Sequence, residues 1–474
     1  MQSDEIDLLN INCGVIVAPA GCGKTQLITK ALVKHKGSKP ILVLTHTNAG
    51  VAALRGRLKQ CRVEPSTYRL ATIDGWAIRL ISTFPKRAGH DQKIIESHKP
   101  NYRAIREAAF NLLKAGHIND VIKASYARLI VDEYQDCSIH QHSIVTCASS
   151  VMPTCVLGDP MQAIFSFDRK DPLADWDKHV CGHFVNEGEL NRPWRWINAN
   201  AEPLGEWLIN VRQKIMKGEA IDLQTAPNTV KWIQLNGTKD DHQKTLIAGR
   251  ISPPGGVGSV LIIGKSTDPN SQHRFASQTP GAVTIEAVDL RDFVSFARDL
   301  NLIAPDALER IVDFAKSLMT NVNANDLIRR VQLLTSGSFR KQPTKVEIAA
   351  QAFQRERTYR RIVDLLVEIK KDTNVRLYRP TVFKICIQAL HICIGENGLT
   401  FYDAAIRVRE QSRFQGRPLP KRAVGSTLLL KGLEAEVSVI LNADDLDAKN
   451  LYVAMTRGSK HLTICSTKST LCPA

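Results

Sequence analysis

The sequence contains no CxxC pair, although 11 cysteines are scattered through its 474 residues. A zinc ribbon or thioredoxin-type motif is therefore excluded, and reduced thiols fit the pattern better than a disulfide framework. No uncharged stretch reaches the roughly 18 apolar residues that a membrane span needs. The N-terminus MQSDEIDLLN carries three acidic residues within its first seven, so it lacks the basic start of a signal peptide. These absences predict a soluble cytoplasmic protein with no segment that spans a membrane.

Internal repeats and low-complexity tracts are also absent, and 43% apolar with 23% charged residues is close to a globular average. Acidic residues are outnumbered, because 47 Asp and Glu face 63 Lys and Arg and the formal net charge is +16. The excess favours a polyanionic partner, either nucleic acid or a membrane surface. The alternative is a soluble protein whose excess charge is only solvated.

The first two hundred residues alternate short apolar runs with amphipathic stretches. The apolar runs are Gly14–Ala18, Ile41–Thr45, Leu129–Asp132 and Cys155–Asp159. Strands that alternate with helices predict a parallel sheet with helices on both faces, which binds ligands beyond the carboxyl ends of its strands. Later strand signals predict a second α/β unit, interrupted from about residue 289 to 410 by a mostly helical pattern; these signals lie at Ser259–Gly264, Val437–Asn442 and His461–Cys465.

The strongest local motif runs from Ala18 to Thr25 and departs from G-x-x-x-x-G-K-[ST] only at its first position. It follows an apolar strand and precedes a helix, which is where a phosphate-binding loop must stand. Lys24 is expected to reach the β and γ phosphates of ATP, and the Thr25 hydroxyl to ligate Mg²⁺. The remaining predicted contacts to the nucleotide come from Ala20, Gly21, Cys22 and Gly23. The Cys22 thiol is either a reactive group or a small residue that simply fits.

A second motif, DEYQD, ends the run that begins at Leu129. Its first two acids, Asp132 and Glu133, could face the same phosphates, where one carboxylate holds Mg²⁺ and its neighbour polarises the attacking water. An acidic pair at a strand end can also be only a cap for the next helix. Together with the phosphate loop, it makes ATP hydrolysis the leading interpretation.

The order of these and further motifs resembles the UvrD/Rep-type helicases of superfamily 1. The further matches, in family order, are Thr45–Ala53 (motif Ia), Thr72–Ala77 (Ib), Gly158–Phe167 (III), Leu190–Arg195 (IV), Lys431–Glu434 (V) and Leu451–Arg457 (VI). The resemblance implies that Glu133 is the catalytic base and that Gln162 senses the γ-phosphate. It also implies that Trp194 stacks on adenine, Glu434 touches the ribose, and two arginines complete the site as arginine fingers; these are Arg195 and Arg457.

The same resemblance implies a path for single-stranded or partly duplex DNA. Thr47, Asn48 and Thr72 would hydrogen-bond to phosphates, which positions a strand without reading its sequence. Trp76 and Phe167 stand where the family stacks bases, although both rings could instead belong to the core.

The implied fold is α/β, with two RecA-like parallel-sheet domains and small, mainly helical insertions. The first RecA-like domain would span residues 1–190, with a short insertion at about 84–125. The second would comprise 191–285 and 415–474, with a reduced helical insertion at 286–414.

Two departures from the family pattern bear on function. Asp74 replaces the usual His of motif Ib, and Leu428 replaces that of motif V. Both changes bear on ordinary DNA contacts at these positions. The compact size, with its short insertions, and the pattern Leu-Leu-Leu-Lys-Gly-Leu-Glu resemble the helicase-like subunit of Gabija-type anti-phage systems, which works beside an OLD-type nuclease. The leading hypothesis is an ATP-driven 3′–5′ translocase or helicase on single-stranded DNA. One alternative is an ATPase that senses DNA ends and nucleotide and regulates a nuclease without unwinding; another is a DNA-binding scaffold without enzymatic activity.

Overall fold

The computed structural model of the protein describes residues 6–91, 93–96, 100–165, 170–265, 267–338, 341–396, 398–412 and 419–473. The chain divides into two compact units. The first comprises Met1–Leu235 and Glu436–Ala474, and the second comprises Asn236–Ala435.

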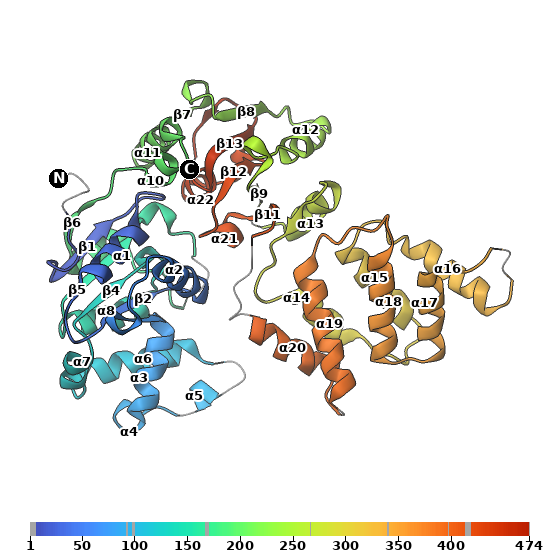
Figure 1. Ribbon diagram of the computed structural model, residues 1–474, viewed down its shortest axis with the longest axis horizontal. Helices are drawn as coiled ribbons and strands as arrows, with labels where there is room; N and C mark the ends of the chain where they lie inside the picture. Colours follow the sequence, from blue (N-terminus) through green and yellow to red (C-terminus); the bar gives the residue numbers. More distant parts are fainter. Residues whose placement is uncertain are drawn as a thin grey trace. The chain divides into compact units, whose positions relative to one another are not determined.

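The first unit contains a six-stranded parallel sheet in the order β3-β2-β4-β5-β1-β6 (Figure 1). Its strands are β1 (Cys13–Val17), β2 (Ile41–Thr45), β3 (Tyr68–Thr72), β4 (Arg128–Val131), β5 (Thr154–Gly158) and β6 (Val185–Glu189). Four of them, β1, β2, β4 and β5, are almost fully buried. Burial of both faces explains why the sequences of β2, β4 and β5 are continuous apolar runs and do not alternate between apolar and polar residues.

Helices cover both faces of this sheet, because successive strand residues point to opposite sides. On β2, Ile41 and Val43 pack in one core cluster with α1 and α2, whereas Leu42 and Leu44 pack in another with α3, α6 and α8. The helices of this region are α1 (Lys24–Lys34), α2 (Asn48–Gln60), α3 (Ile73–Thr83), α4 (Pro85–Ala88), α5 (Lys93–Glu96), α6 (Tyr102–Lys114), α7 (Asn119–Ser125) and α8 (Ile139–Ser149).

A second six-stranded sheet is formed by strands from the later part of the chain. In the first unit β13 pairs with β8, and in the second unit β11 pairs with both β10 and β9; all of these pairs are parallel. The strands are β8 (Val230–Gln234), β9 (Val260–Gly264), β10 (Val283–Thr284), β11 (Arg422–Ser426), β12 (Ala435–Ile440) and β13 (Gly458–Ser466). Two large sheets with parallel pairing confirm the predicted α/β class. A separate antiparallel pair joins β7 (Ile221–Asp222) to β14 (Thr470–Leu471).

The other helices of the first unit lie before β6, between β6 and β7, or before β13. They are α9 (Cys181–His183), α10 (Trp194–Asn198), α11 (Glu202–Met216) and α22 (Ala448–Met455). In the second unit, α12 (Asp240–Gly249), α13 (Pro269–Gln278) and α21 (Thr427–Leu430) accompany the strands.

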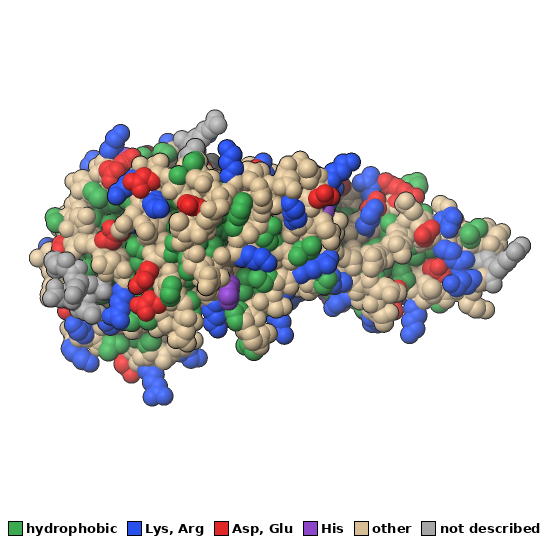
Figure 2. Space-filling model, turned by 90° about the horizontal axis from the view of Figure 1, so that it is seen from above, with side chains coloured by type: hydrophobic (Ala, Val, Ile, Leu, Met, Phe, Trp, Pro, Cys, Tyr) green, Lys and Arg blue, Asp and Glu red, His purple; other side chains and the backbone are tan. Residues whose placement is uncertain are grey.

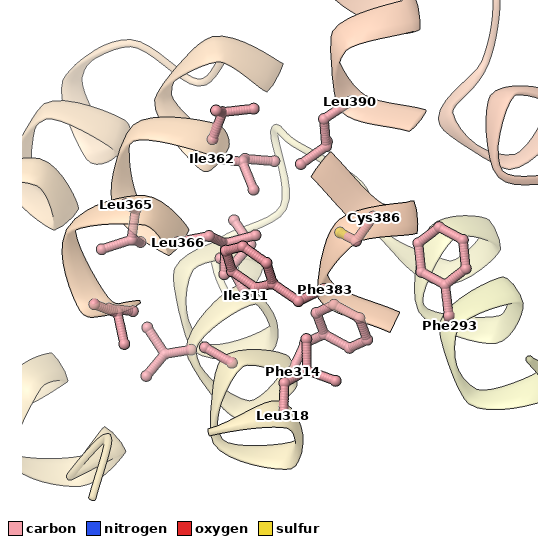
Figure 3. Packing of buried hydrophobic residues seen from close by; sticks show 14 of the residues in the cluster. Phe293, Ile311, Phe314, Leu318, Ile362, Leu365, Leu366, Phe383, Cys386 and Leu390 are labelled. Atoms are coloured by element: carbon pink, nitrogen blue, oxygen red, sulfur yellow. The ribbon is translucent and has the colours of Figure 1, made fainter. Parts of the chain in front are cut away.

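The second unit also contains the predicted helical region, which has its own core. Its helices are α14 (Arg291–Asp299), α15 (Ala307–Leu318), α16 (Ala324–Thr335), α17 (Lys345–Arg355), α18 (Tyr359–Lys371), α19 (Pro380–Gly395) and α20 (Phe401–Ser412). Figure 3 shows side chains from several of these helices converging, among them Phe293, Phe314 and Phe383. A helical region with this much shared apolar surface is a packed subdomain rather than a loose connection.

A buried ion pair anchors this helical region to the strands of its unit. Arg379, directly before α19, donates two hydrogen bonds of 2.7 and 2.8 Å to Glu286, which follows β10. Both side chains are buried, and a paired, hydrogen-bonded arrangement is what makes such charges tolerable away from water.

Basic side chains are spread over the face seen in Figure 2, with acidic side chains among them. Within the described ranges, no helix is both long enough and apolar enough to cross a bilayer.

Candidate active site

The first sheet brings the predicted motifs to one edge. β1 and β5 end in register at Val17 and Gly158, and β2 and β3 end in register at Thr45 and Thr72. The phosphate loop follows β1, the DEYQD segment follows β4 and motif III follows β5. Because the carboxyl ends of parallel strands share an edge, residues far apart in sequence meet there.

The phosphate loop depends on two glycines in left-handed backbone conformations. Gly21 has φ 73° and Gly23 has φ 93°, a region that other residues rarely adopt. A Cβ on Gly21 would lie 2.5 Å from a ring carbon of Trp196, and one on Gly23 would lie 2.9 Å from Cδ1 of Trp194. Both glycines therefore allow the turn and the close approach of tryptophan rings.

Lys24 begins α1 and pairs with both acids of the DEYQD segment. Its Nζ lies 2.5 Å from Glu133 Oε1 and 3.1 Å from Asp132 Oδ1. Burial opposes the charged form of Lys24, but the two carboxylates outweigh it and raise the lysine pKa. Burial raises the pKa of Asp132, Lys24 opposes that rise, and Glu133 adds to it. Two carboxylates facing one ammonium leave the cluster with a surplus of negative charge.

That surplus fits a divalent cation. Mg²⁺ favours oxygen ligands, typically one or two carboxylates together with phosphate oxygens and water. Asp132 supplies a buried carboxylate, and Thr25, the second residue of α1, supplies a hydroxyl. These two residues would hold the ion, as the sequence predicts.

Glu133 has a strained backbone. Its φ of 55° and ψ of 40° are left-handed, although it is neither Gly nor Asn. Such conformations cost on the order of 1–3 kcal/mol and cluster at functional sites. The side chain is held at both oxygens, since Oε1 contacts Lys24 and Oε2 accepts a 2.5 Å hydrogen bond from Gln135 Nε2.

Gln135 continues this chain of bonds into motif III. Its Oε1 accepts a 3.1 Å hydrogen bond from the backbone N–H of Asp159. The Asp159 carboxylate in turn accepts a 3.1 Å bond from Gln162 Nε2. Lys24, the predicted base and the predicted γ-phosphate sensor therefore belong to one hydrogen-bonded chain.

Helix α10 places motif IV against the phosphate loop. The backbone N–H of Arg195 donates to the carbonyl of Gly21 at 3.0 Å, and Trp194 lies beside Gly23 with the Arg192 guanidinium 4.0 Å from its ring centre. The buried Trp196 donates from Nε1 to the carbonyl of Gly458 at 2.9 Å. The residue predicted to stack on adenine and one of the predicted arginine fingers thus lie beside the loop.

Thr456 brings the two predicted arginine fingers together. Arg195 Nη1 donates to its carbonyl at 2.5 Å, and Arg457 Nη2 donates to its hydroxyl at 3.0 Å. Arg457 is buried and also donates from Nε to the carbonyl of Val453. Nearby, the N–H of Ala20 in the phosphate loop donates to Tyr452 Oη at 3.1 Å. Motif VI therefore contacts the loop directly.

Cys22 has the environment of a packing residue. Its side chain is buried, and burial followed by the nearby Asp159 raises its pKa to about 12. A thiol that stays protonated is a poor nucleophile. Of the two interpretations of Cys22, the surroundings therefore favour a small packing residue and not a reactive thiol.

The predicted phosphate contacts to a DNA strand lie at the same sheet edge. Thr47 caps α2 by accepting from the N–H of Gly50, and Thr72 caps α3 by accepting from the N–H of Gly75. Thr47 and Asn48 are exposed. Their exposure leaves them accessible to a ligand, and strand binding by these residues stays a prediction.

The two aromatic predictions differ in their surroundings. Trp76 is only 1% exposed and packs among α3, α6 and α8, which is the core alternative considered from the sequence. Phe167 lies outside the described residues.

Asp74, where the family has His, belongs to a partly buried ionic network. Both of its oxygens accept 2.7 Å bonds from Arg106, and Oδ1 also accepts from Gln141. Arg106 reaches Asp171 at 2.7 Å, and that carboxylate is also bonded to Ser138. The Asp74 side chain therefore ties α3 to α6 and α8.

Glu434 belongs to the second unit, where it is exposed directly before β12. Its predicted contact with the ribose stays a prediction.

Sequence reasoning missed several residues of this site. Gln135, Tyr452 and Thr456 lie within the motifs, but the sequence alone indicates no role for them. Trp196 follows motif IV directly. Arg212 carried a usable signal, because a basic residue on the apolar face of an amphipathic helix indicates a buried ion pair.

Parts of the chain are similar in sequence to known proteins. A family model described as "AAA domain" matches residues 2–168, which contain the phosphate loop and the DEYQD segment. An ATP-dependent helicase/nuclease subunit of Oenococcus oeni (strain ATCC BAA-331 / PSU-1) is 27% identical over 113 residues. That match covers 24% of this chain and 9% of the relative, so the chain spans only a small part of it. Both matches agree with the resemblance to superfamily 1 helicases.

Among solved structures, the Pif1 helicase from Candida albicans aligns over 96% of this chain and 92% of its own, at 12% identity. The TM-score of 0.38 makes this likeness too remote to carry an argument.

Proposed function

We propose that this chain is an ATP-dependent translocase or helicase that moves along single-stranded DNA in the 3′–5′ direction, with Mg²⁺ as cofactor. The observation that carries the proposal is the chain of bonds from Lys24 through Glu133, Gln135 and Asp159 to Gln162. It connects the residue types that phosphoryl transfer requires: a phosphate-binding lysine, a carboxylate base and an amide that can sense the γ-phosphate.

ATP binding would change the partners of this chain. Phosphate oxygens compete for Lys24, which then leaves the Glu133 carboxylate available to accept a proton from the attacking water. The bound Mg²⁺ would neutralise charge that develops on the phosphates. Gln162 would change its position when the γ-phosphate binds or leaves. Because its side chain is bonded to Asp159 at 3.1 Å, that movement would also shift the Asp159 carboxylate.

Steady-state ATPase measurements with and without single-stranded DNA test the ATPase part. We expect DNA to stimulate hydrolysis, and Glu133→Gln to lower kcat by roughly 10²–10⁴-fold, the usual contribution of general base catalysis. Glu64→Gln, at an exposed carboxylate in the same unit, is the matched control. Full activity in Glu133→Gln, or no response to DNA, would contradict the assignment.

Two observations favour a second function, an ATPase that senses DNA ends and nucleotide and regulates a partner nuclease, as the resemblance to Gabija-type systems suggests. The Asp74 carboxylate is bonded to Arg106 and does not point to a DNA-binding surface as a free group, and the Trp76 ring is buried in the core. Both positions would contact DNA in an ordinary member of the helicase family.

Strand displacement separates these functions. A translocase that unwinds should release a labelled strand from a duplex with a 3′ overhang and fail on one with a 5′ overhang. DNA-stimulated ATPase without displacement on either substrate, at saturating ATP, would favour the sensor.

A further inference from the structure

Arg212 is a buried cation in a helix that otherwise presents an apolar face. Helix α11 buries Leu204, Leu208, Val211 and Ile215, and Arg212 lies among them with 3% of its surface exposed. A guanidinium cannot lose its charge by deprotonation in a protein, so its burial requires compensating acceptors.

Two carboxylates supply this compensation. Arg212 Nε and Nη2 lie 3.2 and 3.0 Å from Asp159 Oδ1, and Nη1 lies 2.5 Å from Glu189 Oε1. Asp159 is fully buried, whereas the Glu189 side chain is 49% exposed. The two pairs are therefore unequal, and Arg212 is the principal countercharge for the buried Asp159.

Asp159 is the point where the bonds of the site converge. Its Oδ1 also accepts from the N–H of Met161, and its Oδ2 accepts from Gln162 Nε2, both at 3.1 Å. Its own N–H donates to Gln135, which holds Glu133. The orientation of this one carboxylate thus bears on both the predicted sensor and the predicted base.

We propose that Arg212 is a positioning residue for ATP hydrolysis, which fixes Asp159 and through it the placement of Gln162 and Glu133. This inference rests on the ATPase activity proposed above. Arg212 contacts neither of the two placed residues, so its action is indirect. Two N–H groups of the rigid Arg212 guanidinium point to Oδ1 and so fix the orientation of the Asp159 carboxylate. A lysine ammonium carries the same charge but has no such fixed geometry.

The test compares kcat and the KM for ATP in Arg212→Met and Glu189→Gln, in the presence of single-stranded DNA. In Arg212→Met we expect kcat to fall roughly 10- to 100-fold, the range seen when a residue that orients a reactive group is lost, with KM little changed. Glu189→Gln removes the exposed partner and keeps the contact with Asp159, so kcat should stay close to that of the wild type. Arg212→Lys should recover only part of the rate. An unchanged kcat in Arg212→Met overturns the inference, while the ATPase proposal stands.

A double variant distinguishes a loss of positioning from a loss of folding. Arg212→Met alone leaves Asp159 buried without its cation and could unfold the chain. Arg212→Met with Asp159→Asn removes both charges, and thermal melting should then return toward the wild-type value while kcat stays low. Recovery of both stability and kcat would mean that Arg212 only neutralises a buried charge, which overturns the inference. No ATPase activity in the wild type would overturn this inference together with the proposed function.

Discussion

The Lys24 ammonium lies 2.5 Å from the Glu133 carboxylate, so the predicted phosphate ligand and the predicted catalytic base are each other's partner. The Lys24 side chain is only 12% exposed and that of Glu133 is 34% exposed, so the contact is partly shielded from water and stronger than one at an open surface. A triphosphate that enters the loop must compete for this lysine. The base is consequently engaged until nucleotide arrives, which would limit hydrolysis of ATP that is not properly seated.

Removal of Lys24 should make stability depend on pH. Burial raises the pKa of Asp132 and Lys24 opposes this rise, so in Lys24→Ala the carboxyl pKa should rise further. A group whose pKa is higher in the folded state favours folding below its unfolded pKa, about 4, and loses that contribution as pH rises. We expect the free energy of unfolding of Lys24→Ala, relative to wild type, to fall as pH rises above the unfolded pKa of about 4.

Urea denaturation at each pH measures this effect. Lys34→Ala is the matched control, since Lys34 lies on the same helix and its ion pair with Asp7 is exposed. An equal pH dependence in both variants would contradict the buried cluster.

Trp76 should contribute to stability rather than to DNA binding. Because the ring is buried, Trp76→Ala should lower the free energy of unfolding by about 3–5 kcal/mol. Trp76→Phe keeps much of the apolar volume and should retain wild-type affinity for single-stranded DNA in a fluorescence anisotropy titration. A Trp76→Phe variant with unchanged melting temperature and tenfold weaker DNA binding would instead support base stacking.

Asp74 should likewise be structural. Asp74→Asn leaves the Arg106 guanidinium, only 16% exposed, with a weaker partner, and we expect a loss on the order of 3 kcal/mol. Asp120→Asn, at an exposed position, should stay within about 0.5 kcal/mol of wild type. Urea denaturation compares the two. Unchanged stability together with lost DNA affinity in Asp74→Asn would show that Asp74 serves the strand.

Cys22 should resist alkylation although it stands in the phosphate loop. A pKa raised to about 12 leaves almost no thiolate near neutral pH, and the side chain is 2% exposed. Iodoacetamide should therefore modify the exposed Cys61, Cys181 and Cys472 first, as read by peptide mass spectrometry, and leave ATPase activity intact. Early modification of Cys22 with parallel loss of activity would contradict this.

Local sequence determined the parts of the site that depend on neighbouring residues. The phosphate loop could be predicted because its glycines, lysine and threonine set the backbone turn and the start of α1 within eight consecutive positions. The alternation of apolar runs and amphipathic segments likewise indicated parallel strands covered by helices, since that periodicity reflects burial on both faces.

Tertiary structure alone decided which distant side chains became partners. Asp74 meets Arg106 across 32 positions, Arg212 meets Asp159 across 53, and Arg195 meets Thr456 across 261. Such pairs depend on how strands are ordered and how helices are rotated about their axes. The side of α3 that faces the core, and hence the burial of Trp76, is likewise set by packing against α6 and α8. No periodicity within one segment contains that information, because the free energy comes from surfaces that meet only after the chain has folded.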